Sequence, residues 1–392
     1  MDAQLITNVR IVEPGQRIYP GQVLLRAGRI AAVEPAGAPA PPHATRLDGH
    51  GGLLTPGLID VHTHGVMHSI YESGPEALLS AAKELGRFGV TYVIPTLVPR
   101  IEEAFLRKLE QIADAIPSVH GVRVPGLHLE GPFVAIPGAA CATVDGDLGL
   151  LEELLAACRG RVSVMSVSPE TPNVLPVIER LCERGIKVFL THTRATVEQT
   201  QAALDAGATH ATHFYDVFPA PAETEPGVRP VGVVETMLAD PRATVDFIAD
   251  GVHVHPMAIR AAVAAKGFEG VVLITDSNIG AGGPPGEHDT PWGYRVRIRE
   301  GDAARHAEKN FLAGSALTMD RGIANLLRWL DLPAEQVWAM GTSNPARLLG
   351  LSGQGTLQVG AVADLVLWGE DLHPVLTWVE GECVYAREET GV

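Results

Sequence analysis

The sequence predicts an α/β fold: a (β/α)8 TIM-type barrel joined to a small β-sandwich domain built from both termini. The middle of the chain alternates short apolar runs with helical stretches, as parallel βα units do. Both ends of the chain contain short strands separated by turns. With 392 residues, of which 46% are hydrophobic and 19% charged, the chain can form one large and one small domain. This composition excludes a disordered or fibrous protein.

The predicted barrel spans residues 56–354 and requires eight parallel strands with helices between them. No glycine-rich phosphate loop opens the first unit, which counts against a doubly wound sheet. A long insertion with β character, about residues 279–313, follows the last strand. The expected strands are 58–62, 91–95, 126–130, 162–167, 188–192, 210–214, 244–249 and 271–275. The expected helices include 76–88, 101–115, 147–157, 173–184, 197–206 and 256–265.

The predicted small domain combines residues 1–55 with residues 355–392. Its expected strands are 4–12, 22–26, 29–33 and 363–367, followed by an alternating stretch over 376–385. Gly381 is expected to form a turn within that last stretch.

The charge and the cysteines restrict the partners and the compartment. The 46 acidic and 30 basic residues give a net charge of −16, which disfavours nucleic acid and membrane partners. We expect neither a signal peptide nor a transmembrane helix, because the chain has no matching apolar run. Cys141, Cys158, Cys182 and Cys383 form no C-x-x-C pair, so free thiols and a cytoplasmic location are expected.

Ionisable side chains gather where the predicted strands end, at the face on which barrel active sites lie. His62 and His64 lie two positions apart on the first strand and can point to one face. Nitrogen and oxygen ligands of this kind suit a divalent metal, with zinc preferred and iron or manganese as alternatives. One or two ions are expected. The candidate ligands are His62, His64, Glu130, His192 and His213.

Asp276 follows the last strand of the predicted barrel. A carboxylate there can take a proton from a metal-bound water and deliver it to a leaving amine. The alternative role of Asp276 is to cap the segment after the strand. His128, which lies two residues before Glu130, is expected to be structural rather than a ligand.

Several motifs occur in a fixed order along nearly the whole chain. They are TPGLIDV at 55–61, GLHLEGPF at 126–133, ATHATH at 208–213, IADGVH at 248–253, ITD at 274–276 and LAGSALTM at 312–319. With these motifs the chain resembles the N-acetylglucosamine-6-phosphate deacetylase family, within the amidohydrolase superfamily of metal-dependent barrels.

The resemblance implies roles for individual residues. Glu130, His192 and His213 match the ligands of the metal common to the family, and His62 and His64 match the pair that holds a second metal in some members. Asp276 matches the catalytic aspartate. The resemblance also implies that His253 and the backbone of Leu312 contact the substrate, and that the protein is a homodimer.

The substrate site departs from the family pattern. Asp216 and Val217 stand where the family has an Asn-Ala pair, and Thr224 stands where an arginine near the sugar phosphate is expected. A carboxylate in place of an amide, together with a lost guanidinium, weakens binding of a phosphate dianion. Arg229 is a candidate replacement for that arginine. A stretch ending in Cys141 replaces the Lys-Gly-x-His segment of the sugar site.

We therefore expect metal-dependent deacetylation of a small-molecule N-acyl amine, such as an amino sugar that does not carry the 6-phosphate. A cyclic-amide hydrolase, similar to dihydroorotase or hydantoinase, is the alternative. Such enzymes usually bridge two metals with a carboxylated lysine, and no lysine ends the fourth predicted strand. A non-catalytic scaffold is a third interpretation, but this chain retains every expected ligand.

Overall fold

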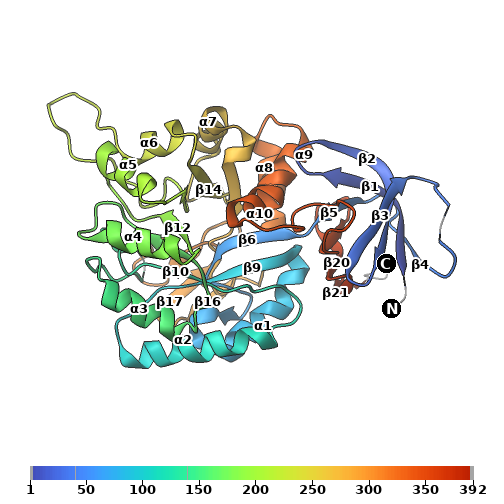
Figure 1. The fold of residues 1–392 in the computed structure, drawn as a ribbon, viewed down its shortest axis with the longest axis horizontal. Helices are drawn as coiled ribbons and strands as arrows, with labels where there is room; N and C mark the ends of the chain where they lie inside the picture. Colours follow the sequence, from blue (N-terminus) through green and yellow to red (C-terminus); the bar gives the residue numbers. More distant parts are fainter. Residues whose placement is uncertain (1–2, 40, 139, 389–392) are drawn as a thin grey trace.

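The computed structural model describes residues 3–388 except 40 and 139, so the outermost ends of the predicted small domain lie outside the described residues. Its central feature is a sheet of eight parallel strands that curves into a barrel (Figure 1). The strand order follows the sequence, which confirms the predicted (β/α)8 topology. The strands are β6 (Leu58–Thr63), β9 (Val90–Leu97), β10 (Leu127–Glu130), β11 (Val162–Val167), β12 (Lys187–Leu190), β13 (His210–Ala211), β14 (Thr244–Ile248) and β15 (Val271–Ile274).

The first and last strands come together where the barrel closes. The backbone N–H of Asp276 donates to the carbonyl of His62 at 2.9 Å. Beside this bond, the Thr275 hydroxyl donates to Oδ2 of the buried Asp60 at 2.6 Å. These bonds place residues from the two ends of the barrel sequence side by side.

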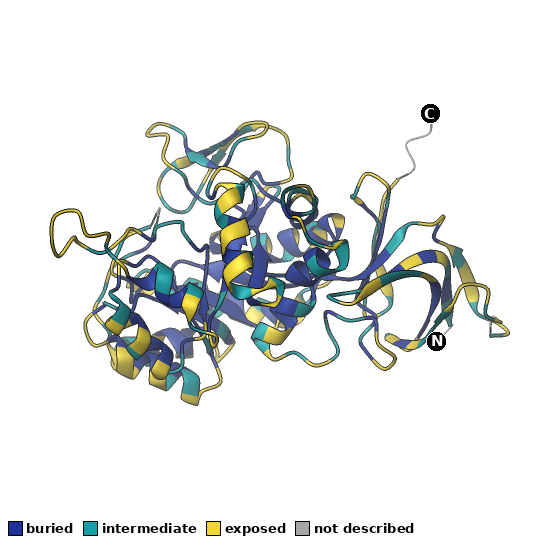
Figure 2. Cartoon of the chain, turned by 90° about the horizontal axis from the view of Figure 1, so that it is seen from above, coloured by how far each residue is buried: buried dark blue, intermediate teal, exposed yellow. Residues whose placement is uncertain are grey.

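Amphipathic helices surround the barrel, with their buried faces toward the strands and their exposed faces outward (Figure 2). Asp147 caps α3, because its carboxylate accepts from the N–H groups of Gly149 and Leu150. The helices are α1 (Pro75–Leu85), α2 (Glu103–Ala115), α3 (Leu148–Ala157), α4 (Val174–Glu183), α5 (Val197–Asp205), α6 (Val233–Ala239), α7 (Pro256–Lys266), α8 (Met319–Trp329), α9 (Ala334–Gly341) and α10 (Ser343–Leu349). Helix α6 occupies a stretch for which the sequence predicted no element.

Four barrel strands end earlier than predicted, and one of them, β14, ends only one residue early, at Ile248 instead of residue 249. Strand β12 ends at Leu190 instead of residue 192, β13 at Ala211 instead of 214, and β15 at Ile274 instead of 275. The backbone turns at His192, His213 and Asp276, whose φ angles are +48°, +37° and +46°. Hydrophobic patterning cannot reveal a left-handed backbone at non-glycine residues, so the predicted strands run through these turns.

The small β domain is built from both ends of the chain, as predicted. Its strands follow one hydrogen-bonded order, β21-β20-β19-β5-β1-β2-β3, with β4 also paired to β1. Side chains from both halves of this order share one apolar core, which includes Ile11, Val23, Leu365 and Trp378. The strands are β1 (Gln4–Glu13), β2 (Arg17–Arg26), β3 (Arg29–Pro35), β4 (Thr45–Asp48), β5 (Leu53–Pro56), β19 (Leu365–Trp368), β20 (Pro374–Val379) and β21 (Glu382–Ala386).

The insertion after β15 is β-rich, as its sequence indicates. Three short antiparallel strands form it: β16 (Gly286–Asp289), β17 (Arg295–Ile298) and β18 (Arg305–His306). A short hairpin of β7 (Gly65–Val66) and β8 (Ser69–Ile70) follows β6. Among the residues that the structure describes, no helix combines the length and the apolar character needed to span a bilayer.

Candidate active site

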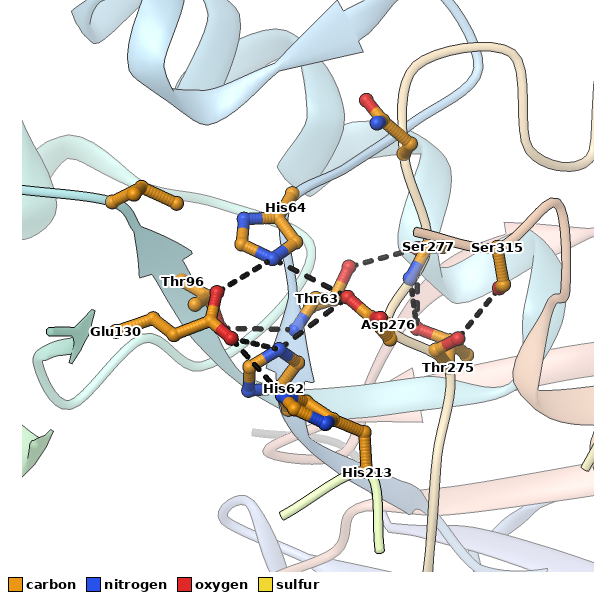
Figure 3. A network of polar contacts seen from close by, with 12 residues as sticks. His62, Thr63, His64, Thr96, Glu130, His213, Thr275, Asp276, Ser277 and Ser315 are labelled. Carbon is orange, nitrogen blue, oxygen red and sulfur yellow. Dashed lines mark hydrogen bonds and ion pairs between the residues drawn. The ribbon is translucent and has the colours of Figure 1, made fainter. Parts of the chain in front are cut away.

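Glu130, the last residue of β10, lies at the centre of a cluster of buried histidines (Figure 3). Its Oε1 lies 3.0 Å from Nε2 of His192 and 3.0 Å from Nε2 of His213. These histidines follow β12 and β13, so parallel neighbouring strands carry all three side chains to one end of the barrel.

A second group of donors lies between the carboxylates of Glu130 and Asp276. Nε2 of His64 lies 3.3 Å from Glu130 Oε2 and 3.3 Å from Asp276 Oδ1, and Nε2 of His62 lies 3.4 Å from the same Asp276 oxygen. Figure 3 shows both histidine rings directed toward these carboxylates. The structure thus brings together the five predicted ligands and the predicted catalytic aspartate.

The cluster strongly perturbs the ionisation of its members. Burial opposes ionisation of Glu130, but the nearby His62, His192 and His213 hold its pKa well below the usual value. Burial also opposes ionisation of Asp276, yet contacts with His62 and His64 lower its pKa. Both carboxylates are therefore anionic at neutral pH. Such shifts at convergent, buried groups are characteristic of functional sites.

The residues fit a divalent metal. Within the described chain, both ring nitrogens of the fully buried His62 have no hydrogen-bond partner, and neither do Nδ1 of His64 and Nδ1 of His192. Buried polar atoms are rarely left unpaired in proteins, so the unpaired Nε2 of His62, which lies 3.4 Å from Asp276 Oδ1, indicates a site for a cation. A set of imidazoles and carboxylates suits zinc and related transition metals.

Outer contacts fix the orientation of His213. Its Nδ1 donates to the carbonyl of Asp216 at 3.2 Å, which leaves Nε2 as the nitrogen that faces Glu130. Its backbone N–H donates to the fully buried Asp246, whose other oxygen lies 2.8 Å from Nε2 of His210. Asp246 could not be recognised from the sequence, because this residue lies in the interior of β14 and its partners come from β13 and the turn that follows it.

His128 has a structural role, as expected. It is fully buried, its Nδ1 donates to the Val61 carbonyl at 3.1 Å, and its Nε2 lies 2.6 Å from the Ser166 hydroxyl.

A cavity of about 110 Å³ opens above the cluster. It contains every predicted site residue except His62, which is buried beneath it, and Arg229. Its lining consists of His64, Val98, Glu130, Ala140, Cys141, His192, His213, Asp216, Val217, His253, Asp276, Trp292, Leu312 and Gly314. Among the described residues that line it there is no lysine or arginine.

Arg229 lies elsewhere. Its side chain is 86% exposed and pairs with Glu235 at 2.9 Å, so in this structure it does not reach the cavity.

His253 lies on the cavity wall in a defined orientation. Its Nδ1 lies 2.7 Å from Oδ2 of Asp250, which leaves the opposite edge of the ring for a ligand. Burial lowers the pKa of His253, but the Asp250 carboxylate outweighs this effect and raises it. The histidine can therefore act as a hydrogen-bond donor.

Trp292 is a lining residue that the sequence analysis missed. It lies between β16 and β17 in the insertion, and its ring meets His64 edge-on at 5.6 Å between centroids. Its indole N–H donates to the buried Glu72, whose other oxygen accepts from the N–H of Val98 at 3.2 Å. In the sequence, Trp292 appears as an aromatic residue in a Pro-Trp-Gly turn within the insertion, and such a turn does not by itself predict which residue it contacts.

Comparison with known proteins agrees with this geometry. The model of the amidohydrolase family matches residues 53–384. An N-acetylglucosamine-6-phosphate deacetylase of Vibrio furnissii is 34% identical over 339 residues, covering 85% of this chain and 83% of that protein. An N-acetylgalactosamine-6-phosphate deacetylase of Escherichia coli O157:H7 is 33% identical, covering 92% of this chain and 94% of that protein.

A solved structure supports the same relationship. The crystal structure of N-acetyl-D-glucosamine-6-phosphate deacetylase from Mycobacterium smegmatis superposes with a TM-score of 0.86 at 30% identity, covering 97% of this chain and 100% of that one. The family match covers most of the chain, including all of the barrel strands. The chain is therefore a member of the amidohydrolase family of metal-dependent hydrolytic enzymes.

Proposed function

We propose that the protein hydrolyses a linear amide and removes the acetyl or related acyl group from an N-acylated amine, in particular an amino sugar. The observation that carries this proposal is the position of Asp276. Its carboxylate lines the cavity 3.3–3.4 Å from His62 and His64, at the edge of the donor cluster. The relatives that are named as deacetylases of amino sugar phosphates support the substrate class.

The residues have distinct roles in the proposed reaction. A divalent cation in the cluster would supply Lewis-acid activation of water and of the amide carbonyl. Asp276, anionic at neutral pH, accepts the proton of the attacking water and then delivers it to the departing amine. His253, oriented by Asp250, donates a hydrogen bond to the carbonyl oxygen of the substrate.

The proposed ligands form two sets that share Glu130. Oε1 of Glu130 lies 3.0 Å from Nε2 of both His192 and His213, whereas His64 contacts Oε2 at 3.3 Å and His62 lies between Oε1, at 3.9 Å, and Asp276. This arrangement accommodates one or two ions, with zinc as the first choice and iron or manganese as alternatives.

We further propose that the preferred substrate lacks the 6-phosphate. Asp216 contributes a carboxylate to the cavity, and the described lining residues include no lysine or arginine. A phosphate dianion would meet repulsion at Asp216 without a charge-assisted partner. Val217 and Leu312 add apolar surface to the cavity, which favours a neutral group.

Acetate release tests both parts of the proposal. Protein loaded with zinc or manganese is given N-acetylglucosamine-6-phosphate and, separately, unphosphorylated N-acetyl amino sugars. We expect higher kcat/KM for the unphosphorylated substrates. Preferential turnover of the phosphorylated sugar would refute the specificity argument, and metal-loaded protein inactive on all N-acyl amines would refute deacetylation.

The Asp276→Asn variant tests the role of the carboxylate. Asparagine tolerates the positive φ of +46° at this position, so the fold is retained. Loss of the general base lowers kcat by about 10²- to 10⁴-fold. Near wild-type activity of the folded variant would assign the proton transfer to another group.

We also propose that the protein works as a cytoplasmic homodimer, based on its family resemblance and its unpaired cysteines. Sedimentation velocity of the purified chain tests the dimer, and a monomer at micromolar concentration would refute it.

A further inference from the structure

A cysteine lies within reach of the proposed metal site. The sulfur of Cys141, a carboxylate oxygen of Glu130 and a ring nitrogen of His192 all lie within 4.8 Å of one another. The Cys141 residue is 8% exposed and lines the same cavity as Glu130 and His192. Three different ligand types therefore converge from β10, from the segment after β12 and from the irregular segment after β10.

The surroundings of Cys141 hold its sulfur near this cluster. Its Sγ–H makes only a weak contact with the backbone carbonyl of Glu130, at 3.7 Å. The same segment presses against His192, because a Cβ atom added at Gly138 would lie 2.3 Å from Cε1 of that ring. The segment that carries Cys141 is thus packed directly onto a proposed ligand.

The cluster contains unpaired nitrogen atoms that can bind a cation. His62 is fully buried, neither of its ring nitrogens has a hydrogen-bond partner within the described residues, and its Nε2 lies 3.9 Å from Glu130 Oε1. This unpaired histidine is independent of the cysteine, and Figure 3 shows it beside Glu130, the carboxylate that also lies near Cys141.

We propose that Cys141 is a metal ligand, and that its thiolate binds the same ion as Glu130 and His192. The inference rests on the metal binding in the proposed function. It assigns Cys141 to the metal, whereas the sequence predicted that this residue contacts the substrate. When the sulfur–metal bond forms, the S–H bond breaks and its proton passes to solvent, with no change in oxidation state. A soft thiolate favours zinc over manganese, so Cys141 also sets the metal preference.

Cobalt(II) substitution tests the proposal without measuring activity. Visible d–d absorption reports that cobalt is bound, and a near-ultraviolet sulfur-to-cobalt charge-transfer band reports that a thiolate is among its ligands. We expect both signals in the wild-type protein and only the visible one in Cys141→Ser. The matched control is Cys158→Ser, which changes a fully buried cysteine on the outer side of the barrel, just after α3, and should keep both signals.

Competition with a chelator gives a second readout. Cys141→Ser should lower zinc affinity by at least about tenfold, because even the loss of a residue that only contacts a metal ligand typically lowers it by that much. The variant should also shift the zinc-to-manganese preference toward manganese. Cys141→His, which restores a ligand atom, should keep more of the zinc affinity but lack the near-ultraviolet band. Circular dichroism confirms that each variant is folded.

The possible failures are distinguishable. Bound cobalt without the near-ultraviolet band in the wild type, or a band that survives in Cys141→Ser, would overturn the role of Cys141 and leave the proposed function intact. Protein that binds no cobalt at all would overturn both.

Discussion

Individual side chains in the cavity define its electrostatics. Glu130 and Asp276 are kept anionic by surrounding histidines, and Asp216 adds a further carboxylate to the lining. The described lining contains no lysine or arginine to balance these charges. We therefore expect the interior of the cluster to accept a cation and the cavity near Asp216 to disfavour a dianionic substituent.

The Asp216→Asn variant tests this charge argument. Removing the carboxylate should lower KM for N-acetylglucosamine-6-phosphate by about tenfold. This change corresponds to about 1.4 kcal/mol, which lies near the upper end of what a single hydrogen bond contributes. Steady-state acetate release measures the change.

The matched measurement uses the unphosphorylated sugar with the same variant, and its KM should change by less than about twofold. Equal changes for both sugars would show that Asp216 does not act through charge.

At the scale of elements, short strands followed by abrupt turns bring the proposed ligands together. His192, His213 and Asp276 all have positive φ angles immediately beyond their strands, as does the β-branched Val217. A backbone conformation of this kind costs of order 1–3 kcal/mol per residue, and it persists where the surrounding packing holds the residue in place. The irregular segment after β10 contributes to that packing through the close approach of Gly138 to His192.

Gly138→Ala should therefore disturb the metal site without unfolding the barrel. The added Cβ would lie 2.3 Å from Cε1 of His192, so either the ring or the segment must move. We expect zinc affinity to fall by about tenfold, as for the loss of an outer contact to a ligand, measured by chelator competition.

Gly286→Ala is the matched control, because its added Cβ would meet nothing closer than 3.6 Å and its φ is not in the left-handed region. Unchanged zinc affinity in Gly138→Ala would mean that the segment relaxes freely away from His192.

At the scale of the whole molecule, polar contacts connect the small β domain to the barrel. Arg123, between β9 and β10, pairs with Asp364 at 2.8 Å and with Glu380 at 2.6 Å. His373, in the turn between β19 and β20, lies 2.6 Å from the buried Asp320 of α8. These contacts fasten the C-terminal part of the small domain to the barrel (Figure 1).

The contact between His373 and Asp320 should make stability depend on pH. The hydrogen bond to Asp320 raises the pKa of His373 in the folded state. The stabilisation is therefore complete below the unfolded value of about 6.5 and is lost as the pH rises through the higher folded value. Because His373 is 46% exposed, we expect a coupling of only about 0.2–1 kcal/mol.

A double-mutant cycle with His373→Gln and Asp320→Asn measures this coupling by urea denaturation at about pH 6 and about pH 9. The coupling should be present at the lower pH and vanish at the higher one. Equal coupling at both values would show that the protonated histidine is not responsible.

The barrel, the two-ended β domain and six of the site residues could be predicted from local sequence, because each leaves a local signal. Parallel strands appear as apolar runs of regular spacing, and His62, His64, Glu130, His192, His213 and Asp276 all stand at or just beyond their ends. A parallel barrel collects its strand ends on one face, so strand position alone predicts that these residues meet.

Other features depended on contacts between distant segments. Trp292 reaches His64 from the insertion, Asp246 supports His213 from another strand, and Arg229 turns toward Glu235 instead of the cavity. Loop paths and left-handed turns follow from tertiary packing and leave no periodic pattern in the sequence. For the same reason the approach of Cys141 to Glu130 and His192 emerged only from the folded chain.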